Sequence, residues 1–197
     1  MAEAKPLDGG EPWTVAEFDR WHAGQPERWE LVGGVPVMMS PPLRPHTTIK
    51  GNIFASLRAK LAGRPCQVYV DGVEVKEQSR KLSAIPDVVV ECGQPATRSP
   101  EVKEPIVIVE VISPSSERDD TGRKWRGYRL IPSVQHYLVV EQDEPAVTIH
   151  TRTGPFSFAE NLVGKGAVEL TALGVSLSID EIYENVDFSQ PDSEPDA

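Results

Sequence analysis

The sequence predicts a mixed α/β domain in which a central β-sheet is flanked by helices. Two β-branched runs, at residues 86–91 and 105–113, have the composition of strands that are covered on both faces. Helix patterns and further strand patterns alternate around these runs along the chain. At 197 residues, the chain is long enough to bury about 70% of its unfolded surface as one domain.

The first expected elements are a short helix and a β-hairpin. Thr14 and Glu17 match a capping box, so a helix is expected from about Val15 to His22. Residues 29–32 and 35–39 have strand composition and are separated by two glycines. This arrangement is typical of a β-hairpin with a glycine turn.

A longer helix and then strands are expected between residues 45 and 75. Apolar residues recur every four positions from about Pro45 to Leu61, which indicates a helix, and Gly63 closes it. Valines on both sides of Asp71-Gly72 mark strands or a hairpin.

The chain leaves the strand at 105–113 through a Ser-Pro turn, and a helix is expected to follow as far as about Leu130. Ser116 with Asp119 would cap this helix, although two glycines within it each cost about 1 kcal/mol relative to alanine. The remaining expected elements are strands at 135–140 and 146–150, a strand beginning at Phe156, and a short closing helix from Ile179 to Asn185.

The two ends of the chain carry much of its net charge of −10. Residues 1–12 are polar and expected to be disordered, and residues 184–197 are expected to form a disordered acidic tail. The domain between them, residues 13–183, has 22 acids and 19 bases. No broad basic face is visible, which counts against tight binding to a nucleic acid duplex.

Composition also predicts the cellular location. The N-terminus lacks the basic and then apolar pattern of a secretion signal, and no apolar stretch is long enough to cross a bilayer. Cys66 and Cys92, the only cysteines, show no metal-binding or redox spacing. We therefore expect a soluble cytoplasmic protein in a reducing compartment, with no membrane partner.

Two acids occupy apolar strands where an ionisable group is unusual. Glu110 lies in the middle of the run at 105–113, and Asp87 opens the run at 86–91. A buried carboxylate must be paired, protonated or bound to a metal. Glu110 could instead pair with a core arginine, and Asp87 could simply open a strand. Together, however, the two acids favour a site for Mg²⁺ or Mn²⁺, which prefer oxygen ligands.

Three further groups complete the candidate site. Glu30 is an acid in the hairpin, and Lys124 follows on the adjoining helix. The backbone carbonyl of Val111 would be a third metal ligand beside Asp87 and Glu110. A lysine near such a metal could orient or deprotonate the attacking water. Each also has a structural alternative: Glu30 could be an exposed hairpin acid, and Lys124 could belong to a solvated basic face.

This order of residues resembles the active-site pattern of the PD-(D/E)XK nuclease superfamily. More specifically, the chain resembles a bacterial family of putative restriction endonucleases that is defined by a domain of unknown function. The resemblance runs over residues 13–183. The matching segments are Trp29–Gly34, Met39–Pro42 with His46, Ile85–Val90, Val109–Ser116, Asp120 with Lys124 and Tyr128, and Gln135–Val140.

The resemblance implies a restriction-endonuclease-like core and Mg²⁺-dependent cleavage of phosphodiester bonds. It places the active site at the residues that match Glu30, Asp87, Glu110 and Lys124. The superfamily's lysine two residues after the glutamate is Ile112 here, so Lys124 is the expected substitute. The expected partners are nucleic acid, with DNA favoured over RNA, and a second copy of the chain in a homodimer.

Four residues are candidates for substrate binding. His46 follows a proline-rich turn, Arg126 belongs to the basic helix, and Ser113 and Tyr128 lie near the acids. Each has a structural alternative, namely a surface position for His46, a solvated basic face for Arg126, helix capping for Ser113 and core packing for Tyr128.

Two other functions remain open at the level of sequence. The chain could keep the nuclease fold as a catalytically inactive interaction module, which the missing local lysine favours. It could also be a metal phosphohydrolase that acts on a small phosphate ester.

Overall fold

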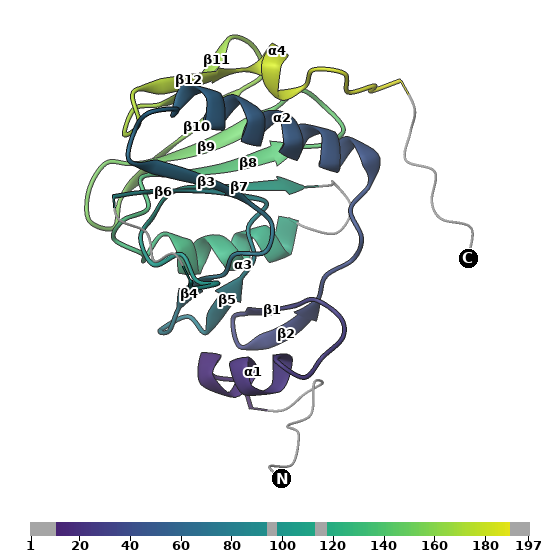
Figure 1. Cartoon of the computed structure of the whole chain (residues 1–197), viewed down its shortest axis with the longest axis vertical. Helices are drawn as coiled ribbons and strands as arrows, with labels where there is room; N and C mark the ends of the chain where they lie inside the picture. The colour runs from purple at the N-terminus through teal and green to yellow at the C-terminus, as the bar shows by residue number, and fades with distance from the viewer. Residues whose placement is uncertain (1–10, 94–97, 113–117, 190–197) are drawn as a thin grey trace.

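A computed structural model of the chain describes residues 11–93, 98–112 and 118–189. Its centre is a six-stranded mixed sheet in the order β10-β9-β8-β7-β6-β3 (Figure 1). Only β7 and β8 are parallel within it. The strands are β3 (Cys66–Val70), β6 (Val88–Cys92), β7 (Pro105–Ile112), β8 (His136–Glu141), β9 (Val147–Arg152) and β10 (Phe158–Val163).

Two smaller sheets accompany the central one. A four-stranded sheet has the order β2-β1-β5-β4, and β11 pairs with β12 in a hairpin. Their strands are β1 (Trp29–Val32), β2 (Val35–Met38), β4 (Val75–Glu77), β5 (Leu82–Ala84), β11 (Ala167–Leu170) and β12 (Val175–Ser178).

The helices lie on both faces of the central sheet, except for the first, which packs against β1 of the four-stranded sheet (Figure 1). They are α1 (Val15–His22), α2 (Arg44–Lys60), α3 (Arg118–Tyr128) and α4 (Ile179–Ile182). The core on the α2 face contains Val107, Val109 and Val111, whereas Ile108 belongs to the core on the α3 face. This alternation along β7 follows from the two-residue period of a strand and explains its continuous apolar composition. The predicted fold class is therefore confirmed.

Several elements lie where local sequence patterns predicted them. The Thr14 hydroxyl accepts a hydrogen bond from the Glu17 backbone, and the Glu17 carboxylate accepts one from Thr14 N, so the capping box forms. The predicted hairpin forms as β1 and β2, and α2 begins one residue before the expected start.

The segment around Asp71 is not a hairpin. β3 pairs with β6 in the central sheet, whereas β4 pairs with β5 in the small sheet. Asp71 and Gly72 have φ of 52° and 72°, which turn the chain from one sheet to the other. β5, β11 and β12 are strands that the sequence analysis did not predict.

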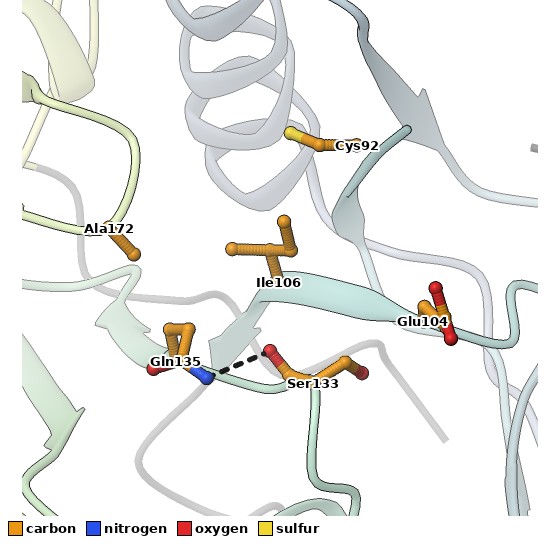
Figure 2. Close-up of a pocket in the computed structure, with 6 residues that line it drawn as sticks. All are labelled: Cys92, Glu104, Ile106, Ser133, Gln135 and Ala172. Carbon is orange, nitrogen blue, oxygen red and sulfur yellow. Dashed lines mark hydrogen bonds between the residues drawn. The ribbon is translucent and has the colours of Figure 1, made fainter. Parts of the chain in front are cut away.

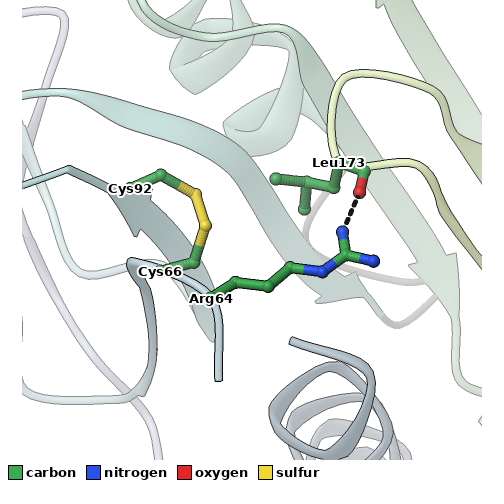
Figure 3. Close-up of a disulfide and its surroundings, with 4 residues drawn as sticks. All are labelled: Arg64, Cys66, Cys92 and Leu173. Atoms are coloured by element: carbon green, nitrogen blue, oxygen red, sulfur yellow. Dashed lines mark hydrogen bonds between the residues drawn. A yellow bond between two sulfur atoms is a disulfide. The ribbon is translucent and has the colours of Figure 1, made fainter. Parts of the chain in front are cut away.

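Cys66 and Cys92 form a disulfide that the sequence analysis did not predict (Figure 3). They lie directly opposite each other in the antiparallel pair of β3 and β6. The pairing arises from strand register, and the spacing of the two cysteines in the sequence gives no signal for it. None of the helices in the described ranges has the length and apolar character needed to span a membrane.

The predicted ends of the chain fall partly outside the described residues, as does the Ser116 cap. Within the described part of the acidic tail, Val186 packs against the core on the α2 face. The rings of Tyr183 and Phe188 also lie 5.6 Å apart.

A close approach between α3 and β5 depends on Gly127. A Cβ atom at this position would lie 2.6 Å from Leu82 Cδ2 and 3.2 Å from Leu82 Cβ. Leu82 is almost completely buried and cannot easily move away. The glycine therefore lets α3 approach the small sheet, and Lys124 and Tyr128 lie on the same stretch of this helix.

We expect Gly127→Ala to lower the free energy of unfolding by about 1–3 kcal/mol, because the added methyl overpacks the contact with Leu82. The matched control is Gly122→Ala in the same helix, where a Cβ would meet no atom within 4 Å. The control substitution should raise the free energy of unfolding by up to about 1 kcal/mol, because alanine has a higher helix propensity than glycine. Urea unfolding of both variants tests this, and equal effects of the two substitutions would contradict it.

Candidate active site

A transverse row of acids crosses three neighbouring strands at one end of the central sheet. Val70 pairs with Val88, and Val88 pairs with Val109. The next residues along the strands therefore bring Asp71, Asp87 and Glu110 into line. A backbone hydrogen bond joins two members of this row, because Asp71 N donates to the Asp87 carbonyl oxygen at 3.2 Å.

Asp87 is held between β7 and α2. Its Oδ2 accepts a hydrogen bond of 2.8 Å from Val111 N. Its Oδ1 lies 2.8 Å from His46 Nε2 and 3.6 Å from Lys50 Nζ. His46 and Lys50 are four residues apart, so both project from the same face of α2. Burial acts to raise the pKa of Asp87, but the contacts with His46, Val111 N and Lys50 outweigh it and lower that pKa.

Glu110 faces α3. Tyr128 donates its hydroxyl proton to Glu110 Oε1 at 2.8 Å, and Lys124 Nζ lies 3.5 Å from the carboxylate. Glu110 is only 6% exposed, and Tyr128 is completely buried. Tyr128 therefore lies beneath the candidate site, against one of its acids.

Lys124 joins the hairpin acid to the strand acid. Its Nζ lies 2.8 Å from Glu30 Oε2, in addition to its contact with Glu110. Glu30 is fixed by its other oxygen, which accepts a hydrogen bond of 2.7 Å from Ile85 N. Both Glu30 and Lys124 are buried. The structure thus brings together Glu30, Glu110 and Lys124, with Asp87 beside them.

The crowding of acids changes the ionisation of Glu110. Burial raises the pKa of this carboxyl group to about 8, and Asp87 and Glu30 add to the increase, whereas Lys124 and Tyr128 oppose it. In the metal-free site, burial and the neighbouring acids therefore favour the protonated form of Glu110. A cation bound there would take the place of that proton.

The donor set suits a hard divalent cation. In a strand, the N–H and C=O groups of one residue point to the same edge, so the Val111 carbonyl also faces the side occupied by Asp87. Two carboxylates and a carbonyl provide oxygen ligands of the kind that Mg²⁺ prefers, and Mg²⁺ usually keeps several waters as well. Within the described ranges, no three His, Cys, Asp or Glu residues cluster as a complete ligand set. Water or substrate would therefore have to supply the remaining positions.

The other predicted site residues are distributed as follows. His46 contacts Asp87, and Arg126 is exposed on α3. Arg126 lies on a different face of the helix from Lys124, because two residues correspond to a rotation of about 200°. Ser113 lies outside the described residues.

Sequence reasoning missed Lys50 and Asp71 as parts of this site. Lys50 Nζ lies 3.0 Å from Asp71 Oδ2 in addition to its approach to Asp87. The four-residue spacing between His46 and Lys50 could have placed both on one helix face. The position of Asp71, in contrast, depends on the pairing of β3 with β6.

A hollow of about 260 Å³ lies at the opposite end of β7 from Glu110 (Figure 2). Its lining residues are Cys92, Glu104, Ile106, Ser133, Gln135 and Ala172. None of these is a predicted site residue, so this hollow is separate from the carboxylates.

Comparisons with known proteins connect this geometry to a family. The model of the family Uma2, described as "Putative restriction endonuclease", matches residues 15–180. Two similar proteins come from Synechocystis sp. (strain ATCC 27184 / PCC 6803 / Kazusa). "Uncharacterized protein slr1290" is 26% identical and aligns over 87% of this chain and 92% of its own length. "Uncharacterized protein sll1609" is 25% identical over 66% of this chain and 75% of its own length.

A solved structure has the same fold. It is that of a putative nuclease belonging to DUF820 from Anabaena variabilis ATCC 29413, with a TM-score of 0.70. The alignment covers 87% of this chain and 98% of that chain at 15% sequence identity. At that level of identity, the match speaks to the fold alone.

We expect the metal-free protein to lose stability as pH rises towards 8 because of Glu110. Its folded pKa of about 8 exceeds the ordinary value of 4.5, so its contribution is fully present below pH 4.5 and lost as pH rises through 8. Glu110→Gln cannot titrate, and its stability relative to the wild type should therefore increase from pH 5 to pH 8. Urea unfolding in EDTA measures this difference.

The control for this comparison is Glu160→Gln, since Glu160 is an exposed acid on β10. Its stability relative to the wild type should change little across the same pH range. A Glu110→Gln protein that is strongly destabilised in EDTA at pH 8 would show that the ionised carboxylate is needed for folding.

Proposed function

We propose that this chain, which belongs to the Uma2 family of putative restriction endonucleases, is a metal-dependent nuclease that cleaves phosphodiester bonds in DNA. The observation that carries the proposal is the meeting of Asp87 and Glu110 on adjacent strands with a buried lysine, Lys124, beside them. Burying such a group of charges is costly, and a catalytic site gives a reason for it.

Each residue has a distinct role in this proposal. Asp87, Glu110 and the Val111 carbonyl would hold Mg²⁺ or Mn²⁺, and the ion would lower the pKa of bound water and neutralise charge on the phosphoryl group. Lys124 orients the attacking water and stabilises the negative charge that builds on the phosphate oxygens. Its ammonium is positioned from both sides, by Glu30 and by Glu110.

Two residues act through Glu110 and Lys124. Glu30 positions Lys124 and is itself anchored by Ile85 N. Tyr128 positions Glu110 by donating a hydrogen bond to one carboxylate oxygen.

In the proposed cleavage step, the oxygen of the attacking water forms a new bond to phosphorus while the bond to the leaving oxygen breaks. The water proton passes to solvent or to the leaving group.

The substrate and assembly complete the proposal. Arg126 is exposed and would contact a backbone phosphate outside the cleavage point. His46, and Ser113 beyond the described residues, are further candidates for phosphate contact. Cleavage of both strands of a duplex needs two active sites, which a homodimer would supply.

One observation favours a second candidate, a catalytically inactive interaction module. Protein cations already lie beside the acids, since Lys124 contacts Glu30 and Glu110, and Lys50 Nζ lies 3.6 Å from Asp87. Such a module would have no need of a metal, so Mn²⁺ titration separates the two functions. The hollow in Figure 2 lies away from these acids and gives no support to a phosphohydrolase for small esters.

Cleavage of DNA should require Mg²⁺ or Mn²⁺ and should fall by at least about 100-fold in Asp87→Asn and in Glu110→Gln. Each substitution removes a charged oxygen ligand while retaining the shape of the side chain. The assay compares single- and double-stranded DNA and RNA in each metal and in EDTA, with Glu160→Gln as the control. Undiminished cleavage by both variants would rule out this site.

Lys124→Ala should lower the turnover number by about 100-fold or more without weakening Mn²⁺ affinity, because its amine contacts water or phosphate and not the ion. Arg126→Ala should instead weaken substrate binding several-fold in a salt-dependent manner. Steady-state kinetics at two salt concentrations, together with calorimetric Mn²⁺ titration, distinguishes these effects. Loss of Mn²⁺ binding in Lys124→Ala would contradict its assigned role.

A further inference from the structure

Lys50 is a buried cation at the site to which the roles above give no task. It projects from α2 and is 7% exposed. Its Nζ lies 3.1 Å from Asp71 Oδ1, 3.0 Å from Asp71 Oδ2 and 3.6 Å from Asp87 Oδ1. A buried ammonium needs a carboxylate partner, and here two carboxylates share one ammonium.

Asp71 is fixed in place as the closer partner. It has a φ of 52°, in the left-handed region that Asp tolerates better than most residues, and its N–H donates to the Asp87 carbonyl. Its side chain is 40% exposed, whereas that of Asp87 is 13% exposed. Asp71 thus draws the ammonium of Lys50 towards the surface and away from Asp87.

We propose that Lys50 couples phosphate binding to metal binding at Asp87, and that Asp71 sets the strength of this coupling. The inference rests on the proposed function, because it takes Asp87 as a metal ligand. A dication on Asp87 and the ammonium of Lys50 repel each other at this short range. Without substrate, Lys50 therefore opposes metal binding.

A phosphate reverses the sign of this effect. A phosphodiester anion bound at the metal attracts the ammonium of Lys50 as well as the dication, so both cations share one partner. Metal and phosphate should consequently bind with positive cooperativity, and the coupling is reciprocal between the two ligands. The direct attraction between metal and phosphate contributes to this cooperativity, and Lys50 adds to it, whereas a lysine with only a structural role would add nothing.

The test measures Mn²⁺ affinity calorimetrically, with and without dimethyl phosphate as a minimal phosphodiester. Without phosphate, Lys50→Met should tighten Mn²⁺ binding about threefold to tenfold, because a nearby positive charge is removed. Asp71→Asn should weaken it by a similar factor, because Lys50 then pairs fully with Asp87. The two substitutions thus shift affinity in opposite directions, and Asp71→Asn should have little effect once Lys50 is Met.

Dimethyl phosphate should tighten Mn²⁺ binding in the wild type and in Lys50→Arg, which keeps the charge, and should do so by a clearly smaller factor in Lys50→Met. The matched control is Lys76→Met. Lys76 also lies between two carboxylates, with Nζ 2.8 Å from Asp19 and 2.9 Å from Glu74, but it belongs to the small sheet. This control should lower the melting temperature and leave Mn²⁺ affinity unchanged.

Shifts of Mn²⁺ affinity in the same direction for Lys50→Met and Asp71→Asn, or no shift, overturn the inference while the metal site stands. Asp71 is partly exposed, so Asp71→Asn alone decides the matter if Lys50→Met does not fold. Unchanged Mn²⁺ affinity in Asp71→Asn then overturns the inference. Failure of the wild type itself to bind Mn²⁺ overturns the metal site of the proposed function, and this inference with it.

Discussion

The buried carboxylates of Glu30 and Glu110 and the partly buried carboxylate of Asp87 lie near one another and have to be neutralised by the elements around them. β7 supplies a backbone N–H to Asp87, and α2 supplies His46. α3 supplies Lys124, which contacts both glutamates. Burial and the neighbouring acids also raise the pKa of Glu110 to about 8, which favours its neutral form in the metal-free protein.

The arrangement of helices and sheets around the acids provides the groups that neutralise these carboxylates. α2 and α3 cover opposite faces of the central sheet, yet Lys50 of α2 and Lys124 of α3 both lie at the same end of β6 and β7 (Figure 1). The small sheet brings Glu30 to Lys124, and Gly127 allows α3 to approach that sheet closely. Helices and hairpin therefore meet at a point where none could bury its charged group alone.

Elements with a strong local pattern could be predicted from sequence. The capping box of α1, the four-residue apolar repeat of α2 and the apolar runs of β6 and β7 each depend on neighbouring residues, and each was located. β5 has only three residues, Leu82–Ala84, and no alternation that would identify it. It forms because β1 and β4 pair with it from both sides.

The residues of the candidate site were likewise predictable where a local pattern marks them. Glu110 was conspicuous because it interrupts an apolar strand, and the pairing of β6 with β7 then placed Asp87 near it. Lys50 is four residues after His46, so helix spacing could have placed it beside that candidate. The role of Asp71 could not be inferred in this way, because it depends on which strand lies next to β6, and only the folded sheet decides that strand order. The cysteine pair escaped prediction for the same reason.

The cysteine pair has a consequence for how the sheet can misalign. β3 is an edge strand, and edge strands are the ones most prone to slip along their neighbours. A slip by one residue would turn every side chain of β3 to the opposite face and separate Asp71 from Asp87. The covalent link between Cys66 and Cys92 excludes that slip. The alignment of the acids is therefore secured five residues away from them, at the far end of the same two strands.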